Sequence, residues 1–582
     1  MAQFHISPAD YVVMAGYFVI VLGIGIHFRN RVEAAQDFFA GGHQIPWWLA
    51  GISHYMSSFS AFSFIAYAQV GYTYGWVSVT LFWASVPACV LGGLFFAQRW
   101  RRARIITPVE FLERRFNALI RQLFAWAGIP MKIFDDALKV FATGLFVSLA
   151  VGVDLRAAIL LCGLVMVAYS FLGGLWALVV TDYVQFLMKA MAILLLLPLA
   201  LIRAGGPVRA LSALPSGFFH PINGPYGWTY ILGFCLIILI SYNASWPLAQ
   251  KYYSVANERD ARKAAYFAAA LNFLCAPLMI LPSIVARNLL PQLLSQRRTA
   301  DVYVLLVLRL LPVGMIGIIV AAMFSSTMAV VSADFNAIAS VLTKDVYQRL
   351  MNVRASDRHL LFVGRVVTLS LGAATIVLSL VIALTRQQAL FNTMATVLGL
   401  FMAPTLLPLL AGLTVRRLNW QGAFLGFLSG LGTGLCMLAL KTWWLPYQGR
   451  MALFGSVYNF EGIGFLANVA LTMLGMVAGT LLTSSRGAEP EAVRVFFRGL
   501  DKPVAASEGR SNMNAGTNSV IGISTLGVGA LLLVAGLLSG SPAAAVIDIC
   551  CAALLGLLGV LFLRKKPPDP RGEVDVAESS GL

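Results

Sequence analysis

The sequence predicts an all-α protein that crosses a membrane many times, and three observations support this. Hydrophobic residues make up 59% of the 582 residues and charged residues 12%, with a mean hydropathy of +0.80. Such values lie outside the range of ordinary soluble domains. Apolar segments of about 20 residues, each long enough to cross a bilayer as a helix, recur along the chain. Short basic clusters separate these segments, as the positive-inside rule predicts for a polytopic protein.

The distribution of charge argues against nucleic acid as a partner and predicts an orientation. The net charge is +17, but the basic residues occur in short clusters between apolar segments, such as HFRNR, QRWRRAR and LRKKPPDPR. Placing these loops in the cytoplasm puts the N-terminus outside and the C-terminus inside. We therefore expect an integral protein of the cell (inner) membrane, surrounded by lipid and with no nucleic-acid partner.

Hydropathy predicts about fifteen membrane helices, with boundaries that are uncertain by a few residues. The expected spans are 10–28, 46–71, 75–98, 119–151, 154–175, 179–203, 229–251, 259–287, 313–343, 359–385, 391–415, 420–440, 459–483, 518–539 and 545–563.

Two of these spans contain residues that interrupt a helix. The second span contains YMSSFSAFS (55–63), and the seventh contains SYNASWP (241–247), in which Pro247 lacks a backbone donor. The two interruptions lie five spans apart. Unwound segments at matching positions of two halves indicate an inverted-repeat transporter with its site near the middle of the membrane. The alternative is a pair of kinked, serine-rich packing helices.

This pattern predicts a division of the chain into seven parts. We expect a leading helix and loop, a first repeat of core helices 1–5, a second repeat of core helices 6–10, two trailing helices, a cytoplasmic linker, a final helix pair and a disordered tail. The corresponding ranges are 1–45, 46–203, 204–415, 416–483, 484–517, 518–563 and 564–582.

Several segments resemble the sodium:solute symporter family, which includes glucose, sialate, proline and pantothenate carriers. DFFAGGHQIPWWLAGIS resembles the start of the family's first core helix, and ITPVEFLERRF the segment after the second. AYSFLGGLWALVVTDYVQ resembles the link between the fourth and fifth core helices. MFSSTMAVVSADFNAIASVLTKDVYQ resembles the eighth core helix, and FMAPTLLPLLAGLTVRRLNWQGAFLG the tenth.

This resemblance extends from about Pro8 to Gly430 and implies a fold. The expected architecture is a ten-helix core of two inverted five-helix repeats, with core helices 1 and 6 broken, plus one leading and about four trailing helices. The implied function is secondary active transport of a small polar solute by alternating access, coupled to a cation. The implied class is therefore a transporter and not an enzyme.

The resemblance also implies a shared sodium site between the break in core helix 1 and the face of core helix 8. In sodium-coupled members, helix 1 supplies two carbonyls, and helix 8 supplies one carbonyl and two hydroxyls, which are hard ligands suited to a hard cation. The helix 1 positions here are Met56 and Phe59, and the helix 8 carbonyl position is Ser326. The two hydroxyl positions are Ala329 and Val330, so both side-chain oxygens are missing. A second family sodium position is half retained, by Asp182 and Ser332.

Two unusual charges lie near the missing ligands. Lys189 follows Asp182 by seven residues, which places it two turns and ~10 Å further along the same helix face. Asp334 follows Val330 by four residues on core helix 8. An ammonium at the sodium position could bond to the Met56 and Phe59 carbonyls, Ser326 or Asp334, which leaves Na⁺, H⁺ or no coupling ion open. The alternative is that Lys189 extends to the interface or pairs with Asp136 or Asp182.

The positions that match the family's substrate pocket carry short, neutral polar groups. Such groups suit a small polar solute, for example a sugar, a sugar acid or another small organic molecule. The alternative for each residue is ordinary packing between helices, which we also weigh for His54 beside the helix 1 break. The candidate residues are Ser58, Ser63, Trp83 (or Phe82), Tyr242 (or Ser241), Asn243, Ser245, Asn272 and Thr396.

Other functional classes receive little support from the sequence. The six histidines are scattered and form no H-E-x-x-H motif, and the seven cysteines lack metal-ligand spacing. We expect no catalytic residue, no cofactor and no metal beyond a sodium ion. A membrane sensor built on a transporter fold needs an output domain, and neither 484–517 nor the tail resembles one.

Overall fold

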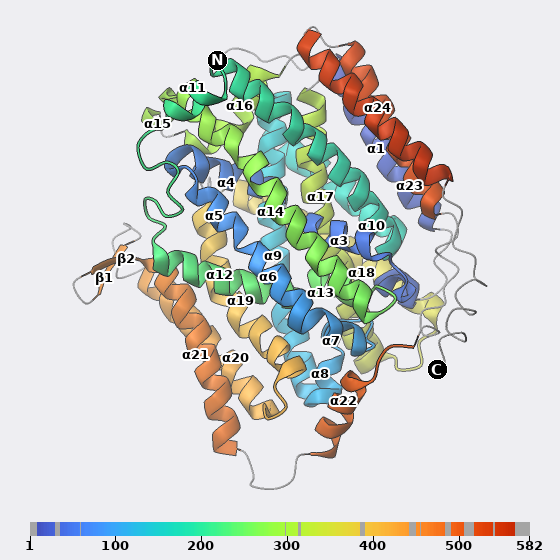
Figure 1. The fold of residues 1–582 in the computed structure, drawn as a ribbon. Coiled ribbons are helices and arrows are strands. Elements are labelled where there is room, and N and C mark those ends of the chain that lie inside the picture. Colours follow the sequence, from blue (N-terminus) through green and yellow to red (C-terminus); the bar gives the residue numbers. More distant parts are fainter. Residues whose placement is uncertain are drawn as a thin grey trace, which may run out of the picture.

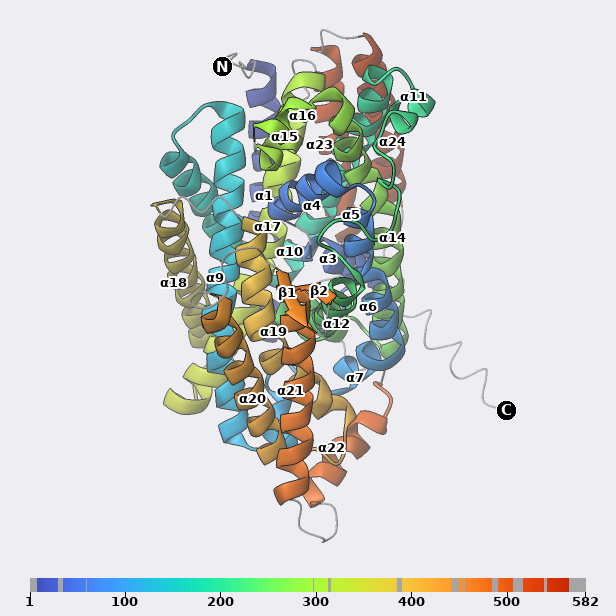
Figure 2. The same ribbon diagram turned by 90° about the vertical axis from the view of Figure 1, so that its left-hand side faces the viewer.

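The structure is a computed structural model that describes residues 8–29, 35–58, 60–296, 298–311, 316–384, 390–441, 450–453, 456–483, 490–505, 517–538 and 542–564. These residues are almost entirely helical (Figures 1 and 2). Short 3₁₀ or π segments carry the label η. The first part of the chain forms α1 (Pro8–Arg29), α2 (Ala35–Ala40), η1 (Gly41–His43), α3 (Trp47–Met56), α4 (Ala61–Tyr74), α5 (Val77–Trp83), α6 (Ser85–Leu91), η2 (Gly92–Phe96), α7 (Ala97–Arg102), α8 (Phe111–Arg115), α9 (Ala118–Val151), α10 (Leu155–Arg203) and α11 (Pro207–Ser212).

The remaining elements follow in chain order. They are α12 (Trp228–Ala244), α13 (Trp246–Tyr253), α14 (Glu258–Leu289), α15 (Gln292–Ser295), η3 (Thr299–Asp301), α16 (Val302–Leu310), α17 (Ile316–Ser340), η4 (Val341–Met351), α18 (Asp357–Leu384), α19 (Leu390–Thr414), α20 (Trp420–Ala439), β1 (Arg450–Leu453), β2 (Ser456–Asn459), α21 (Phe460–Thr483), α22 (Glu491–Asp501), α23 (Thr517–Leu537) and α24 (Pro542–Arg564).

Both predicted helix interruptions are present. The first core helix ends as α3 at Met56 and resumes as α4 at Ala61. The sixth core helix is α12 followed by α13, and the two are bent by 50° at Ser245. Pro247 occupies the first turn of α13, where the amide that it lacks has no helical partner to lose. The prediction of broken core helices 1 and 6 is therefore confirmed.

The link between the fourth and fifth core helices is a tight turn within α10. Gly174 has φ +58° and ψ −165°, a conformation that favours glycine. A Cβ atom at Gly174 would also lie 2.8 Å from the ring of Phe38. The glycine of the LGGLW motif therefore permits both the turn and the close approach of α2.

Helix α17 lies in the middle of the bundle in both views (Figures 1 and 2), and every residue from Ile316 to Ser340 is buried. It packs against α1, α9, α10 and α18. A helix that is apolar on all sides is expected at such a central position. The functional residues predicted on core helix 8 therefore face other helices rather than lipid.

The trailing helices pack on two sides of the core. Helices α20 and α21 form a pair against α12 and α19, whereas α23 and α24 form a pair against α1 and α10 (Figure 1). The hairpin of β1 and β2, which the sequence did not predict, precedes α21, with Arg450 opposite Asn459.

The segment 484–517 contains more than the expected linker. Its described part forms α22, whose apolar side chains recur at helical spacing and are buried near α7 and α8. These residues are Val493, Phe496, Phe497 and Leu500. The stretch 491–501 is therefore a packed amphipathic helix within the predicted linker. The other domain boundaries stay predictions.

Nine helices among the described residues are long and apolar enough to cross a membrane, or ten if the bent pair α12–α13 counts as one span. Other expected spans correspond to helices that are too short or too polar to meet this description. The first core helix is split, Leu155–Phe171 and Phe401–Thr414 are short, and α9 carries charged residues in its middle. The total of fifteen spans stays a prediction.

Candidate ion and substrate site

The break in the first core helix is held by a hydroxyl of the central helix. The backbone N–H of Ala61, the first residue of α4, donates to Thr327 Oγ1 of α17 at 2.9 Å. Thr327 Oγ1 also lies 2.7 Å from Thr143 Oγ1 of α9. At the same helix start, Ser60 and Ser63 form a capping box. Thr327 and Thr143 were not predicted as site residues, although a threonine beside the Ser325–Ser326 pair was visible in the sequence.

The face of α17 at the expected sodium position offers little oxygen for a cation. Ala329 and Val330 are buried and have apolar side chains. The hydroxyl of Ser326 donates to the Ala322 carbonyl at 2.9 Å, and that of Ser332 donates to the Met328 carbonyl at 2.6 Å. Both hydroxyls therefore use their hydrogen atoms within their own helix. The residues present do not reproduce the hydroxyl pair that the family resemblance implies.

Lys189 lies beside the end of α3. Its side chain is buried, and its Nζ atom is 4.0 Å from the centroid of the Tyr55 ring. Tyr55 immediately precedes Met56, the last residue of α3 and one of the two predicted carbonyl positions. The C-terminal end of a helix carries partial negative charge, and an ammonium over an aromatic ring is attracted to it. Phe59, the other predicted position, lies outside the described residues.

Asp182 contacts the first half of the broken helix. Its Oδ2 atom accepts a hydrogen bond from Ser53 Oγ of α3. The buried Lys251 of α13 interacts electrostatically with both Asp182 and Asp334. Lys251 Nζ has no hydrogen-bond partner among the described residues. Lys251 was missed in the sequence because it falls at the predicted end of its span, where a lysine is ordinary.

The expectation that Asp334 serves as a partner for Lys189 is not met. Asp334 Oδ1 lies 2.8 Å from Nζ of Lys132, and Oδ2 lies 3.3 Å from Nζ of Lys139. Both lysines belong to α9, which packs directly against α17. The physical reason is that Asp334 faces α9, where two ammonium groups are already within ion-pair distance.

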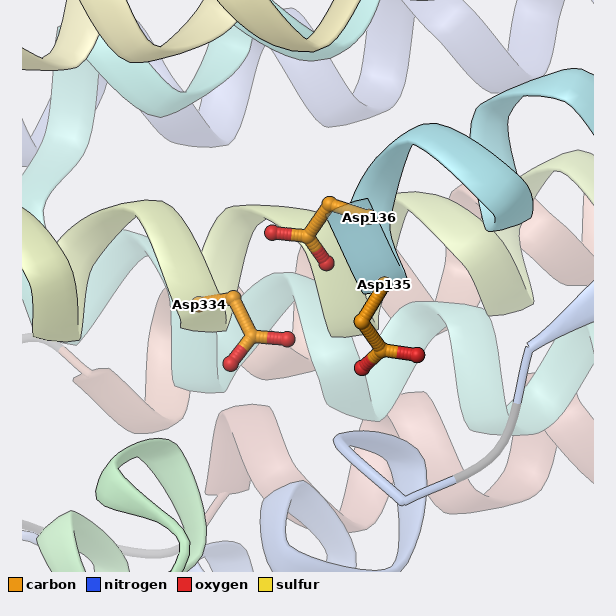
Figure 3. A group of neighbouring side chains, drawn as sticks. All are labelled: Asp135, Asp136 and Asp334. Carbon is orange, nitrogen blue, oxygen red and sulfur yellow. The ribbon is translucent and has the colours of Figure 1, made fainter. Parts of the chain in front are cut away.

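The same part of α9 carries two further carboxylates. Lys139 Nζ lies 2.8 Å from Asp135 Oδ2 and 3.3 Å from Asp136 Oδ1. Figure 3 shows Asp135 and Asp136 on α9 and Asp334 on α17 around the same small volume. One carboxylate oxygen from each of the three residues lies within 4.8 Å of the other two. The segment KIFDDALK places four charged residues inside an apolar span, and charges in such a span usually pair with one another. This segment was therefore the sequence signal for the group of charges.

Some predicted substrate residues lie near the two helix breaks. Ser58 Oγ donates to the Tyr55 carbonyl at 2.8 Å, and Ser245 occupies the bend between α12 and α13. The ring of Tyr242 lies 5.9 Å from that of His54, centroid to centroid. His54 also stacks on Tyr252, and its ring nitrogens have no hydrogen-bond partner among the described residues.

Other predicted substrate residues take part in contacts between or within helices. Asn243 Nδ2 donates to the Ala88 and Leu239 carbonyls, each at 2.9 Å. Asn272 Nδ2 donates to the Ala268 carbonyl at 2.8 Å. These bonds agree with the packing alternative for the two asparagines.

The remaining predictions have separate outcomes. Trp83 Nε1 donates to the Phe273 carbonyl at 3.0 Å and stacks on the Phe273 ring, which places Trp83 against α14. Ser63 Oγ accepts from the Ser60 amide and so belongs to the cap of α4. The side chain of Thr396 lies outside the described residues. The substrate residues as a set stay a prediction.

A network of charges ties α8 to the end of the central helix. Glu113 lies 2.5 Å from Arg121 of α9 and 2.5 Å from Arg349 of η4, and Arg121 also pairs with Asp345. The hydrogen bond from Arg349 lowers the pKa of Glu113 below its ordinary value; partial burial opposes this, and Arg121 adds to it. The ITPVEFLERRF motif thus connects core helices 2, 3 and 8 at one end of the bundle.

A helical bundle with two broken helices beside a buried central helix defines the class of protein as a secondary transporter. Residues 38–430 match the model of the sodium:solute symporter family. The chain belongs to this family, and it is a transporter rather than an enzyme.

Relatives of known function share the family at low identity. The sodium/sialic acid symporter NanT of Aliivibrio fischeri is 25% identical over 442 residues, which cover 73% of this chain and 87% of the relative. The sodium/sialic acid symporter SiaT of Proteus mirabilis is 23% identical, with 82% and 96% covered. The sodium/glucose cotransporter 2 of Rattus norvegicus is 26% identical, with 74% and 72% covered.

A solved structure supports the fold. A Na⁺-coupled sialic acid symporter in a substrate-bound outward-open state aligns with a TM-score of 0.69. The alignment covers 83% of this chain and 100% of the symporter at 21% identity. The all-α polytopic fold, with its core of two inverted repeats, is therefore confirmed.

Proposed function

We propose that this chain is a carrier of a small polar organic solute in which the Lys189 ammonium takes the place of the family's shared sodium ion. The observation that carries the proposal is the contact of Lys189 Nζ with the Tyr55 ring, 4.0 Å from its centroid, beside the end of α3. A sodium ion at that position would neutralise the same helix end and hold α3 near α17. A lysine does so without leaving the protein.

The residues on the opposite face support this assignment. Ala329 and Val330 supply no side-chain oxygen at the two positions where the family resemblance implies hydroxyl ligands. A sodium ion loses its hydration shell on binding and needs hard oxygen ligands in return. With two of the family's five ligands missing, sodium binds too weakly here to drive transport. Sodium-independent or proton-coupled transport follows from this proposal.

The substrate class rests on the family and on the polar groups near the helix breaks. Relatives named for sialic acid and glucose suggest a sugar acid or a sugar. Ser58, Tyr242 and Ser245 offer hydroxyls without a side-chain charge near the breaks. We further propose that the protein lies in the cell (inner) membrane with its N-terminus outside and its C-terminus in the cytoplasm, because the basic loops then face the cytoplasm.

The test is uptake into proteoliposomes that contain the full chain, with radiolabelled sialic acid and D-glucose as probe solutes. Sodium and pH gradients are imposed separately, with choline replacing sodium in the control. We expect uptake of at least one probe that a sodium gradient changes less than twofold and that Lys189→Ala abolishes. Several-fold stimulation of the unmodified protein by sodium would sink the proposal.

A second readout does not depend on the choice of solute. A ligand that binds only the folded state raises its thermal stability. We expect sodium chloride and choline chloride at equal ionic strength to give the same melting temperature. A clear rise in sodium alone contradicts the replacement of sodium by Lys189.

A further inference from the structure

Five charged residues form a buried group between α9 and α17, here called the α9–α17 cluster. Its members are Lys132, Asp135, Asp136, Lys139 and Asp334, and each is at most 8% exposed. The ion pairs within it measure 2.8 Å to 3.3 Å. Apart from Asp334 and Asp136, which the sequence offered as partners for Lys189, no residue of the cluster belongs to the sodium positions that the family resemblance implies.

The cluster contains more acid than base. Three carboxylates, those of Asp135, Asp136 and Asp334, face two ammonium groups, those of Lys132 and Lys139. If all five groups are ionised, one negative charge is left over in a buried space. An uncompensated charge is costly there, and carboxylates whose oxygens lie within 4.8 Å cannot all ionise easily. A bound proton or a monovalent cation removes the excess.

Among the described residues, no positive charge outside the cluster lies within ion-pair distance of its three carboxylates. The largest charge interactions of Asp136 are with the other members of the cluster. Lys251 of α13 also acts on Asp334, but its first electrostatic partner is Asp182 of α10. Arg365 of α18 lies over the Phe171 ring of α10. Helices α4 and α19, which also pack against α9, contain no Asp, Glu, Lys, Arg or His among their described residues.

Asp136 is the carboxylate best suited to hold a proton. Asp135 and Asp334 each have a lysine nitrogen at 2.8 Å, whereas the lysine beside Asp136 is 3.3 Å away. Asp136 Oδ2 has no hydrogen-bond partner among the described residues, and Asp136 is fully buried. Figure 3 shows its carboxylate beside that of Asp334. A proton on Asp136 therefore relieves both the excess charge and the repulsion of the pair.

The cluster has a slightly exposed outer part and a buried inner part. The side chains of Lys132, Asp135 and Lys139 are about a tenth exposed, whereas those of Asp136 and Asp334 are sealed. Lys132 lines a narrow cavity between α9, α13 and α19. That cavity shares Met131 and Thr405 with a larger one of ≈ 380 Å³.

We propose that Asp136 carries an exchangeable proton and that the α9–α17 cluster is a proton-binding site of this carrier. Binding leaves the cluster neutral and holds α9 against α17. Release leaves one negative charge between the two helices and weakens their contact. The role of this proton as the coupling ion rests on the proposed sodium-independent function; the binding itself does not.

The experiment is pH-dependent infrared difference spectroscopy on the purified full chain, because the stretching band of a protonated buried carboxyl is distinct from that of a carboxylate. We expect a carboxyl band that appears on acidification and that Asp136→Asn removes. Asp548 of α24 is the matched control, since it is also buried and has no hydrogen-bond partner among the described residues. Asp548→Asn should leave the Asp136 band unchanged.

Three results would overturn the inference. One is an unchanged band in folded Asp136→Asn protein, as judged by size-exclusion chromatography. If that variant fails to fold, Asp136→Glu replaces it. A carboxyl band of Asp136→Glu at the same frequency as in the unmodified protein is the second result that overturns the inference. The third is loss of the band at constant pH when sodium chloride replaces choline chloride, which assigns the site to a cation. Sodium-stimulated uptake contradicts only the proposed function and leaves the band in place.

Discussion

Asp334 of α17 and Lys132 of α9 form an ion pair in the interior of the bundle, with Oδ1 and Nζ 2.8 Å apart. This pair joins the central helix to core helix 3. The Asp334 carboxylate is thus occupied by α9, while Lys189 of α10 lies at the helix 1 break beside Tyr55. The two unusual charges that looked like partners in the sequence therefore serve different contacts, and this separation leads to the predictions that follow.

Loss of Lys132 should destabilise the protein strongly. Lys132→Met leaves three buried carboxylates with one lysine, and breaking a buried pair on one side costs about 3–5 kcal/mol. We expect a clear fall in the melting temperature of detergent-purified protein. Adding Asp334→Asn should recover part of it, because the second change removes the carboxylate left without its partner. Arg298→Met, in a surface pair with Asp301, is the control and should change little. Equal effects of the Lys132 and Arg298 substitutions contradict this prediction.

Thr327 should support the broken helix through its hydroxyl. Thr327→Val keeps the shape of the side chain but leaves the Ala61 amide without its acceptor. An unsatisfied buried donor costs about 1–3 kcal/mol. The matched control is Thr368→Val, since Thr368 is equally buried and its hydroxyl donates to the Gly364 carbonyl of its own helix. A melting temperature that falls no further for Thr327→Val than for Thr368→Val argues against the role.

Restoring the family's hydroxyls should create a sodium site. In the triple variant Lys189→Ala, Ala329→Ser, Val330→Thr, the ammonium is removed and two oxygen ligands face the helix 1 break. We expect its melting temperature to be higher in sodium chloride than in choline chloride. At a sodium concentration of 100 times Kd, binding stabilises the folded state by about 2.7 kcal/mol. Lys189→Ala alone is the control and should not respond. A sodium response of equal size in the control places sodium binding elsewhere.

The network at Glu113 should make a small, pH-dependent contribution to stability. Its pKa is lowered in the folded state, chiefly by the hydrogen bond from Arg349. The contribution is therefore fully present above the ordinary glutamate value of about 4.3 and is lost as the pH falls through the lowered folded-state pKa. Glu113→Gln should lower the melting temperature at pH 7 and less so well below pH 4. Glu491→Gln, at an exposed pair with Arg494, is the control. If the difference in melting temperature between Glu113→Gln and the unmodified protein grows on acidification, the direction of the Glu113 pKa shift is wrong.

Helix boundaries and breaks were largely predictable because they depend on local chemistry. The expected span 229–251 corresponds to α12 and α13, from Trp228 to Tyr253. The bend at Ser245 follows from Pro247 in the next turn. The turn at Gly174 likewise follows from a glycine that can adopt positive φ. In each case, the residue that breaks the helix is also the residue seen in the sequence.

Helix α22 shows a signal that was overlooked. Val493, Phe496, Phe497 and Leu500 have the spacing of one helix face, but the surrounding polar residues suggested a linker. The hairpin of β1 and β2 is different, since its strands have four residues each and carry little periodic signal.

The sequence by itself determined the membrane class, the family and the residues missing from the sodium position, because each depends on residue type and order along the chain. Only the tertiary structure decided which charges meet. Lys132, Lys139, Lys189 and Lys251 are all lysines in apolar surroundings, and nothing in their local sequence ranks them as partners for Asp334. That choice depends on how α9, α10 and α13 pack around α17, since Coulomb attraction and hydrogen bonding act over a few ångströms between helices far apart in the chain. The packing assigned Asp334 to Lys132 and Lys139 and left Lys189 at the end of α3.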